Sequence, residues 1–552
     1  MLEVPPPLPE DTPRQTASRR TRKKGADLWK VLLSLYILAA SIGLSYHLLT
    51  RRPANQANPA INPWAEFIQR TSPRENHQAR LTDAFNRQDA SLLRSHSESG
   101  DAQAQTYLAS LYADGAGVAQ DLTLAVTWYE KAVEAGVPTA FNNLGLLHLQ
   151  GEVAAADPVL GVSLVRQAAE HNLPLALYNL GWAYENGKGV EADPPRASEF
   201  YLRAAQAGIA RAQNAVGYRY ERGEGVPQDF EKAVYWYRKA ALSGHARAQN
   251  NLGYAYERGQ GVAKDTEKAL YWYQQAAEQG ESTAQYNLAL LYTELDPPEP
   301  DRAFEYFLQA AEAGDVDAIA QVGAAYQKGR GPAVNLEQAL DWYRKGATLG
   351  HGACMNQVGI FYLNGLGVDP NDAAAAHWFL KAAEAGNVIG MDNTGWMYQN
   401  GYGVPDDLKV ALKWYRQAAE RAHASAQESV ADFYANGWVV EKDLQVAFDW
   451  YLKAARQGRA TAQNRVALAY DNGDGVRRND AEAVAWYRKA AEQGLAVAQY
   501  NLALMLLHGE GIEADREKAI AWFERASAQG YQDAELELEK LVERDRSSAQ
   551  LS

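Results

Sequence analysis

The chain of 552 residues contains a single cysteine, Cys354. One cysteine forms no intrachain disulfide, and it excludes a metal site built from several cysteines. An excess of basic residues is also missing, because 54 Lys and Arg stand against 68 Asp and Glu and give a net charge of −14. This balance argues against a general nucleic-acid-binding protein, which needs a clustered basic face to neutralise phosphates.

Motifs that carry catalysis are missing as well. The ten histidines are scattered, and no H-E-x-x-H sequence occurs. Gly187-Lys188 is followed by Gly189 rather than by Ser or Thr, which breaks the pattern of a phosphate-binding loop. The recurring G-x-G sequences follow no predicted strand. We therefore expect a protein that is not an enzyme, with no catalytic or metal-binding residues, no cofactor and no small-molecule substrate.

An uncharged segment near the start of the chain predicts a membrane anchor. Residues 31–50 read VLLSLYILAASIGLSYHLLT, and 20 helical residues at ~1.5 Å each reach ~30 Å, the thickness of the hydrocarbon core of a bilayer. Seven Lys and Arg precede this segment and two follow it. The positive-inside rule predicts a single-pass protein of the cytoplasmic (inner) membrane, with the basic, Pro-rich tail of residues 1–30 in the cytoplasm and the rest in the periplasm or extracytoplasmic space. A cleavable signal peptide is the alternative, because Ala39-Ala40-Ser41 is a possible cleavage site.

Glycine and aromatic residues are abundant, with 44 Gly, 31 Tyr and 14 Trp, and they recur with a period of 36 residues. Such a period is typical of repeat proteins, in which one small unit is copied many times. We number the positions of each unit from zero. Successive units lie 36 residues apart, except that the sixth unit is 34 residues long. The twelve units begin at Ala104, Ala140, Ala176, Ala212, Ala248, Ala284, Ala318, Cys354, Gly390, Ala426, Ala462 and Ala498.

Each unit predicts a helix, a tight loop and a second helix. The first helix has apolar residues at positions 0, 4, 5 and 8, such as Ala248, Leu252 and Tyr256, which share one helical face. A G-x-G-V loop follows, and its first Gly accepts the left-handed conformation that ends a helix. Asp or Asn at position 17 of eleven units is expected to cap the second helix. Trp at position 24 of nine units is expected to belong to the core.

A helix pair of this length buries its apolar face only by stacking against neighbouring pairs. We therefore predict an all-α fold, a right-handed α/α superhelical solenoid of about twelve helix pairs over residues 79–544. A lone helix over residues 80–99 and another over residues 534–544 are expected to cover its ends. Residues 51–78, with four prolines, are expected to form a flexible linker, and residues 545–552 a disordered tail.

The pattern A-x-x-x-L-G-x-x-Y-x-x-G-x-G-V-x-x-D-x-x-K-A-x-x-W-Y-x-K-A-A-x-x-G resembles the Sel1-like repeat, a relative of the tetratricopeptide repeat. The fourth, fifth and eleventh units match it at nearly every position. The resemblance implies an α/α superhelix that serves as an adaptor or scaffold, often in bacterial envelopes or membrane-associated complexes. Three units depart from it: the second has Leu164 and Val165 in place of aromatics, the sixth has LDPPEPD in place of the Gly loop, and the tenth has Trp438 and Val439 within its loop.

Core packing does not use positions 2, 6, 9 and 10 of the first helix. The residues at these positions predict a binding surface. In superhelices of this kind the first helices line the concave face. An aromatic residue with Asn and Arg nearby can hold an extended peptide, because Asn pairs with the peptide backbone. The alternative is that Asn bridges adjacent helices and the aromatics fill gaps between them. The candidate partner-binding residues are Trp182, Tyr218, Tyr254, Trp396, Asn214, Asn250, Arg222 and Arg258.

Three hypotheses for function follow. The first is a membrane-tethered scaffold or adaptor whose superhelix binds partner proteins or peptides on the extracytoplasmic side. The second is an enzyme or accessory that acts on cell-wall or secreted glycan, which a clustered pair of carboxylates with perturbed titration would favour. The third is a regulator dedicated to one sensor of the cell envelope, which differs from the first hypothesis in having a single partner.

The predicted topology can be tested with reporter fusions. A reporter that works only in the cytoplasm, fused after Ser552, is expected to stay inactive, because the positive-inside rule sends the C-terminus across the membrane. The same reporter fused before residue 30 is expected to be active and serves as the control. Activity of the C-terminal fusion would contradict the topology.

Overall fold

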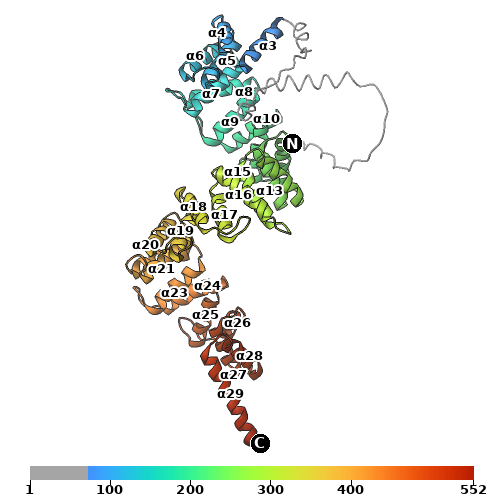
Figure 1. The fold of residues 1–552 in the computed structure, drawn as a ribbon. Coiled ribbons are helices and arrows are strands. Elements are labelled where there is room, and N and C mark those ends of the chain that lie inside the picture. The colour runs from blue at the N-terminus through green and yellow to red at the C-terminus, as the bar shows by residue number, and fades with distance from the viewer. Residues whose placement is uncertain (1–72, 552) are drawn as a thin grey trace, which may run out of the picture. The chain divides into compact units, whose positions relative to one another are not determined.

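The computed structural model describes residues 73–551, and these form 27 α helices and no strand (Figure 1). The all-helical prediction is therefore confirmed for this part of the chain. The predicted tail 1–30, the predicted anchor 31–50 and most of the predicted linker lie outside the described residues. Within residues 73–551, no helix combines the length and the apolar composition that a membrane span requires.

Twenty-four of the helices form twelve pairs, one pair for each unit of the sequence, and Figure 1 shows them following one another in chain order. The first helices are α5 (Ala102–Asp114), α7 (Pro138–Gln150), α9 (Pro174–Asn186), α11 (Ala210–Arg222), α13 (Ala246–Arg258), α15 (Ser282–Glu294), α17 (Val316–Lys328), α19 (Gly352–Asn364), α21 (Val388–Asn400), α23 (Ala424–Asn436), α25 (Ala460–Asn472) and α27 (Ala496–His508). The second helices are α6 (Leu122–Glu134), α8 (Pro158–Glu170), α10 (Pro194–Gln206), α12 (Phe230–Leu242), α14 (Thr266–Ala277), α16 (Pro300–Glu312), α18 (Leu336–Thr348), α20 (Asp372–Glu384), α22 (Leu408–Glu420), α24 (Leu444–Arg456), α26 (Asp480–Glu492) and α28 (Arg516–Ser527).

The second helices begin as the sequence predicts. In all eleven units with Asp or Asn at position 17, this side chain accepts a hydrogen bond from a backbone N–H in the first turn of the second helix. In the fourth unit, Asp229 accepts from the N–H of Lys232, and the ammonium of Lys232 lies 2.9 Å from the same carboxylate. The sixth unit lacks this residue, and Glu299 makes no side-chain cap before Pro300.

The loops between the two helices need glycine for two different reasons. Gly223 ends α11 in the left-handed conformation, with φ of 73°. Gly225 has φ of 70°, and a Cβ atom there would lie 2.2 Å from the carbonyl oxygen of Pro194 in the preceding repeat. The loop of one repeat thus rests directly on the start of the second helix before it. In the tenth unit Val439 takes the place of this glycine and still has a positive φ, 50°.

Each repeat buries an apolar residue near position 25, and in the third, fourth, fifth, seventh and ninth repeats this residue is a tyrosine that packs against a glycine at position 5 of its own first helix. Tyr237 is 1% exposed, and a Cβ atom on Gly217 would lie 2.6 Å from its ring. The tryptophans at position 24 also pack against the core, as predicted, but most of them are only partly buried. A lysine three residues later covers the outer ring face in several units, as Lys453 does over Trp450 at 3.7 Å.

The helix pairs stack as a solenoid. The main contacts join helices that are consecutive in the chain, and the closer approaches between alternate helices join first helices, such as α7 with α9 and α19 with α21. The buried residues form a series of clusters along the array rather than one centre.

Two predictions about the ends were wrong. The expected single helix over residues 80–99 is divided into α3 (Pro73–Asn86) and α4 (Ala90–Glu98), so α3 also begins within the predicted linker. The break occurs because Gln88 takes a left-handed conformation and Asp89 caps a new helix through the N–H of Leu92. At the other end, α29 (Gln532–Leu551) continues through most of the predicted disordered tail, since no Gly or Pro interrupts it.

The loop geometry makes a matched pair of substitutions informative. We expect Gly225→Ala to lower the free energy of unfolding by roughly 2–4 kcal/mol, because the left-handed conformation costs an alanine about 1–2 kcal/mol and the clash with Pro194 adds to it. Gly208 has φ of 90° with open space around it, so Gly208→Ala is expected to show the conformational cost alone. Urea unfolding measures both values. Equal losses would contradict the contact between loop and helix.

Candidate interaction surface on the first helices

The predicted aromatic residues at position 6 lie on the first helices and are half in solvent. Tyr218 on α11 is 39% exposed, Tyr254 on α13 is 38% exposed and Trp396 on α21 is 41% exposed. Trp182 on α9 is more deeply set and packs at the edge of the second core cluster. Tyr218, Tyr254 and Trp396 are not needed to fill the core, because the residues at positions 8 and 25 already fill it.

The structure brings the predicted arginines to two of these rings. The guanidinium carbon of Arg222 lies 5.4 Å from the ring centre of Tyr218, and that of Arg258 lies 5.6 Å from the ring centre of Tyr254. One turn of helix separates the partners, so each pair forms a cation–π contact on the helix surface. Trp396 belongs to a different arrangement, because its ring stacks on Tyr402 at 4.9 Å.

The predicted asparagines, by contrast, join neighbouring repeats. Asn251 donates to the side-chain oxygen of Asn214 at 3.0 Å, and Asn287 donates to that of Asn250 at 2.9 Å. Asn142, Asn356 and Asn464 accept equivalent bonds, each from a residue 37 positions further along the chain. The alternative that Asn214 and Asn250 bridge adjacent helices is therefore confirmed, and their role as ligands for a peptide backbone stays a prediction. We call these interactions the asparagine clips.

Sequence reasoning also missed the role of the carboxylates at position 9. Glu221 accepts a hydrogen bond from the hydroxyl of Tyr237 at 2.5 Å, and Glu257 accepts one from Tyr273 at 2.8 Å. Burial and the neighbouring carboxylate raise the pKa of both tyrosines, so the hydroxyls stay protonated as donors. The sequence did contain a sign of this hydrogen bond, because Glu or Gln at position 9 occurs together with Tyr at position 25 of the same unit.

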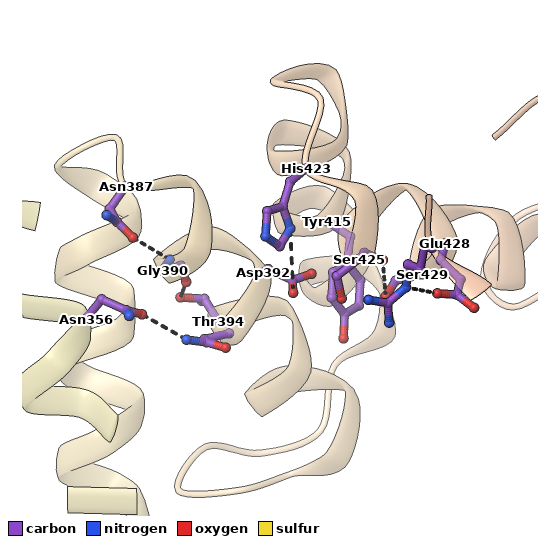
Figure 2. Close-up of polar contacts among 12 residues, drawn as sticks. Asn356, Asn387, Gly390, Asp392, Thr394, Tyr415, His423, Ser425, Glu428 and Ser429 are labelled. Atoms are coloured by element: carbon purple, nitrogen blue, oxygen red, sulfur yellow. Dashed lines mark hydrogen bonds and ion pairs between the residues drawn. The ribbon is translucent and has the colours of Figure 1, made fainter. Parts of the chain in front are cut away.

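The asparagine clip is broken in the ninth repeat (Figure 2). Asp392 stands at position 2, and its carboxylate faces His423 at the start of α23, with 3.7 Å between Oδ2 and Nδ1. His245, the equivalent residue in the fifth repeat, caps its own helix, whereas His423 makes no such cap. The second carboxylate oxygen of Asp392 is buried without a hydrogen-bond partner. Burial raises the pKa of Asp392, while His423, Ser425 and Arg459 oppose that shift.

The same change continues into the tenth repeat. Glu428 takes position 2 there and is held by the guanidinium of Arg459 and by the hydroxyl of Thr461 at 2.9 Å. Asp432 takes the aromatic position 6 and accepts a hydrogen bond from Tyr451. Neutral clips are thus replaced by charged contacts across two successive repeats.

A pocket at the end of the array lacks the features of a glycan-hydrolysing site. The cavity of about 600 Å³ is lined by Arg488, Asp515, Lys518 and Trp522 among others. Its Asp515 caps α28 and pairs with Lys518 at 2.8 Å, and these contacts lower the pKa of the carboxyl. Glu513 also lines the cavity, but a glycosidase acid needs a raised pKa, so Asp515 does not suit the role of the acid.

Helix pairs of constant length that stack on their neighbours define an α/α repeat solenoid. The model of the Sel1 repeat matches the chain twelve times, and the chain belongs to the Sel1 repeat family. Sel1 repeats are generally non-catalytic scaffolds, and they place this chain among the proteins built for protein–protein interaction. The matches cover residues 102–137, 139–173, 174–209, 210–245, 246–281, 282–315, 316–351, 352–387, 388–423, 424–458, 460–495 and 496–531.

Solved structures of bacterial repeat proteins are similar to the chain. A protective antigen present in uropathogenic Escherichia coli strains, which displays an SLR fold, is 30% identical over 83% of this chain and 90% of that one, with a TM-score of 0.58. A Sel1 repeat protein from Oxalobacter formigenes is 31% identical over 44% of this chain and 96% of that one, with a TM-score of 0.40. The comparison with curated proteins finds no match.

The broken clip predicts a pH-dependent stability. Because burial raises the pKa of Asp392 above the ordinary 3.8, its contribution to stability is present at low pH and is lost as the pH rises through the raised value. We expect Asp392→Asn to raise the free energy of unfolding at pH 7 by about 1 kcal/mol and to change it little at pH 3. Thermal unfolding at both values measures this. Asp369→Asn removes an exposed carboxylate and is the control; an equal gain in both variants would contradict the assignment.

Proposed function

We propose that the chain is a membrane-tethered interaction scaffold whose solenoid binds protein or peptide partners on the periplasmic or extracytoplasmic side. The observation that carries this proposal is the row of aromatic residues at position 6 of three consecutive repeats, Trp182, Tyr218 and Tyr254. Aromatic rings left half in solvent are typical of protein-binding surfaces, where they supply a large contact area at a low cost in conformational entropy.

The surroundings of these rings support recognition rather than catalysis. The polar groups beside them already have partners within the fold, as the asparagine clips and the bonds from Tyr237 to Glu221 and from Tyr273 to Glu257 illustrate. A surface whose buried polar groups are paired within the fold can bind another chain through its partly exposed rings without leaving those groups unpaired.

The close approaches between first helices favour a concave location for this surface. Alternate helices come nearest to one another on the side of the first helices, as α13 and α15 do. An array that is tighter on one side curves toward that side, so an extended partner can contact several repeats at once. The right-handed sense of the superhelix and the concave position of the rings are parts of the proposal.

The membrane tether follows from residues 31–50 and their flanking charges. An anchor of that kind, followed by a linker, would hold the solenoid near the extracytoplasmic face of the inner membrane. A tethered scaffold gains effective concentration toward partners in the same membrane, which favours the capture of membrane-associated proteins.

Affinity capture from solubilised native membranes, with the full chain as bait, tests the proposal. We expect a defined set of proteins to bind the wild type and to be lost from the triple variant Trp182→Ala, Tyr218→Ala, Tyr254→Ala. Circular dichroism of the variant should be unchanged, because these rings lie at the edge of the core. Recovery of one protein alone would favour the dedicated regulator.

The matched control replaces exposed apolar residues of the second-helix side. Tyr271 is 55% exposed, Leu242 is 70% exposed and Leu349 is 55% exposed. The control variant Leu242→Ala, Tyr271→Ala, Leu349→Ala should keep the captured proteins. Retention by the first variant together with loss from the control would place binding on the second helices and contradict the proposed surface.

A further inference from the structure

Most arginines of the solenoid have partners within the fold. Arg238 donates to the hydroxyl of Tyr256 at 3.0 Å, and Arg344 donates to that of Tyr362 at 2.7 Å in the equivalent contact. Arg219 is 3% exposed and pairs with Glu185 at 3.3 Å. These side chains hold consecutive helices together and are not available to a ligand.

Three arginines of the fourth and fifth repeats are among those that have no such partner. Arg211, Arg222 and Arg247 are exposed, and in residues 73–551 none of them makes a hydrogen bond or an ion pair with another side chain. Arg258, the fourth arginine on these helices, pairs only with the adjacent Glu257, at 3.3 Å. All four guanidinium groups therefore keep donors directed at solvent.

The four arginines stand at both ends of the same two helices. Arg211 and Arg247 lie in the first turns of α11 and α13, and Arg222 and Arg258 lie in the last turns. Arg211 is held 5.6 Å from the ring centre of Tyr178. After burial, Arg211 and Arg247 are the causes that lower the pKa of His245, so both charges act on one point between the two helices.

Acidic side chains on these helices are turned toward the fold. Glu221 and Glu257 are committed to the hydroxyls of Tyr237 and Tyr273, while the arginines point outward. The outer charge of α11 and α13 is therefore positive on a chain whose net charge is −14.

The ninth and tenth repeats show that this charge is local. At position 10, where α11 and α13 have arginine, α21 and α23 have Asn400 and Asn436. At position 2 they have Asp392 and Glu428. The exposed positive charge of α11 and α13 is thus not repeated on α21 and α23, whose carboxylates at position 2 are largely buried and face His423 and Arg459.

We propose that the surface formed by Arg211, Arg222, Arg247, Arg258, Tyr218 and Tyr254, which we call the arginine–tyrosine surface, binds an acidic, extended segment of a partner protein. This inference rests on the proposed scaffold function and names the chemistry of its partner. Guanidinium groups pair with carboxylates through two parallel hydrogen bonds, and an arginine packed on a ring is already oriented for that contact. The faces of Tyr218 and Tyr254 take the apolar side chains between the acidic ones.

The spacing of the helices fits this occupant. The clip between Asn214 and Asn251 makes α11 and α13 direct neighbours, and neighbouring helices pack about 8–10 Å apart. A peptide in the extended polyproline II conformation advances ~3.1 Å per residue with three residues per turn, so acidic residues three apart lie on one face and reach equivalent arginines of consecutive repeats.

Fluorescence anisotropy with a labelled peptide of four Glu-Leu-Ser triplets tests the proposal on the full chain in detergent. We expect binding that weakens as NaCl rises from about 50 mM to about 500 mM, and no binding of the same peptide with Gln in place of Glu. Affinity should fall about tenfold or more in the variant Arg211→Gln, Arg222→Gln, Arg247→Gln, Arg258→Gln. The control variant with the same change in net charge is Arg330→Gln, Arg456→Gln, Arg477→Gln, Arg488→Gln, and it should bind as the wild type does.

A second readout locates the peptide. Carboxylates placed between Arg211 and Arg247 should raise the pKa of His245, which histidine-selective NMR titration measures with and without peptide. An equal loss of affinity in both quadruple variants would overturn the proposal, because binding would then follow net charge alone.

Two experimental outcomes distinguish failure of this inference from failure of the proposed scaffold function. Capture of native partners that survives the arginine substitutions, but not those at Trp182, Tyr218 and Tyr254, would overturn the acidic-partner assignment and leave the scaffold intact. Binding to vesicles of anionic lipid that depends on the four arginines, with no binding of the glutamate peptide, would also overturn it.

Discussion

In five repeats a tyrosine at position 25 packs against a glycine of the first helix, and this contact sets the distance between the two helices. A side chain on Gly217 would lie 2.6 Å from the ring of Tyr237, so the two helices reach their separation only because that side chain is absent. The hydroxyl at the far end of the ring then donates to Glu221, which fixes the ring along the first helix. One residue therefore fills the core, sets the helix separation and satisfies a polar group. The aromatic residues at position 6 have none of these three structural roles.

Several positions of the first helix make contacts that the fold requires, and this explains why the candidate surface is built from so few kinds of residue. Positions 2 and 3 of the first helix are taken by the clips between repeats, and position 9 is taken by the tyrosine hydroxyl. In the fourth and fifth repeats, positions 6 and 10 have neither of these roles. Tyr218 and Arg222 occupy two of these places in the fourth repeat, and their contact uses no group that the fold requires.

The period of the sequence was sufficient to predict the helix pairs, their caps and their loops, because each depends on residues close together in the chain. Asp229 and Gly223 act within a few residues of their own positions. The role of Asn214 could not be predicted in the same way, because its partner Asn251 lies 37 residues away on another helix. A helical wheel marks Asn214 as surface and contains no information on the neighbouring repeat. The division of the first capping helix was missed because Gln88 adopts a left-handed conformation without being a glycine.

Contacts confined to neighbouring repeats also explain how the charged contacts of the first helices can differ along one scaffold. Replacing a clip with Asp392 and His423 alters the join between the ninth and tenth repeats, and the ninth repeat still donates the clip to the eighth, from Asn393 to Asn356. The irregular tenth loop, with Val439 in a left-handed conformation, is likewise followed by a regular eleventh loop, in which Gly475 packs on Leu444. A globular core would spread such changes through shared packing, whereas a linear array limits them to one or two joins. The surface chemistry of each segment can therefore differ while the stacking of the helices stays the same.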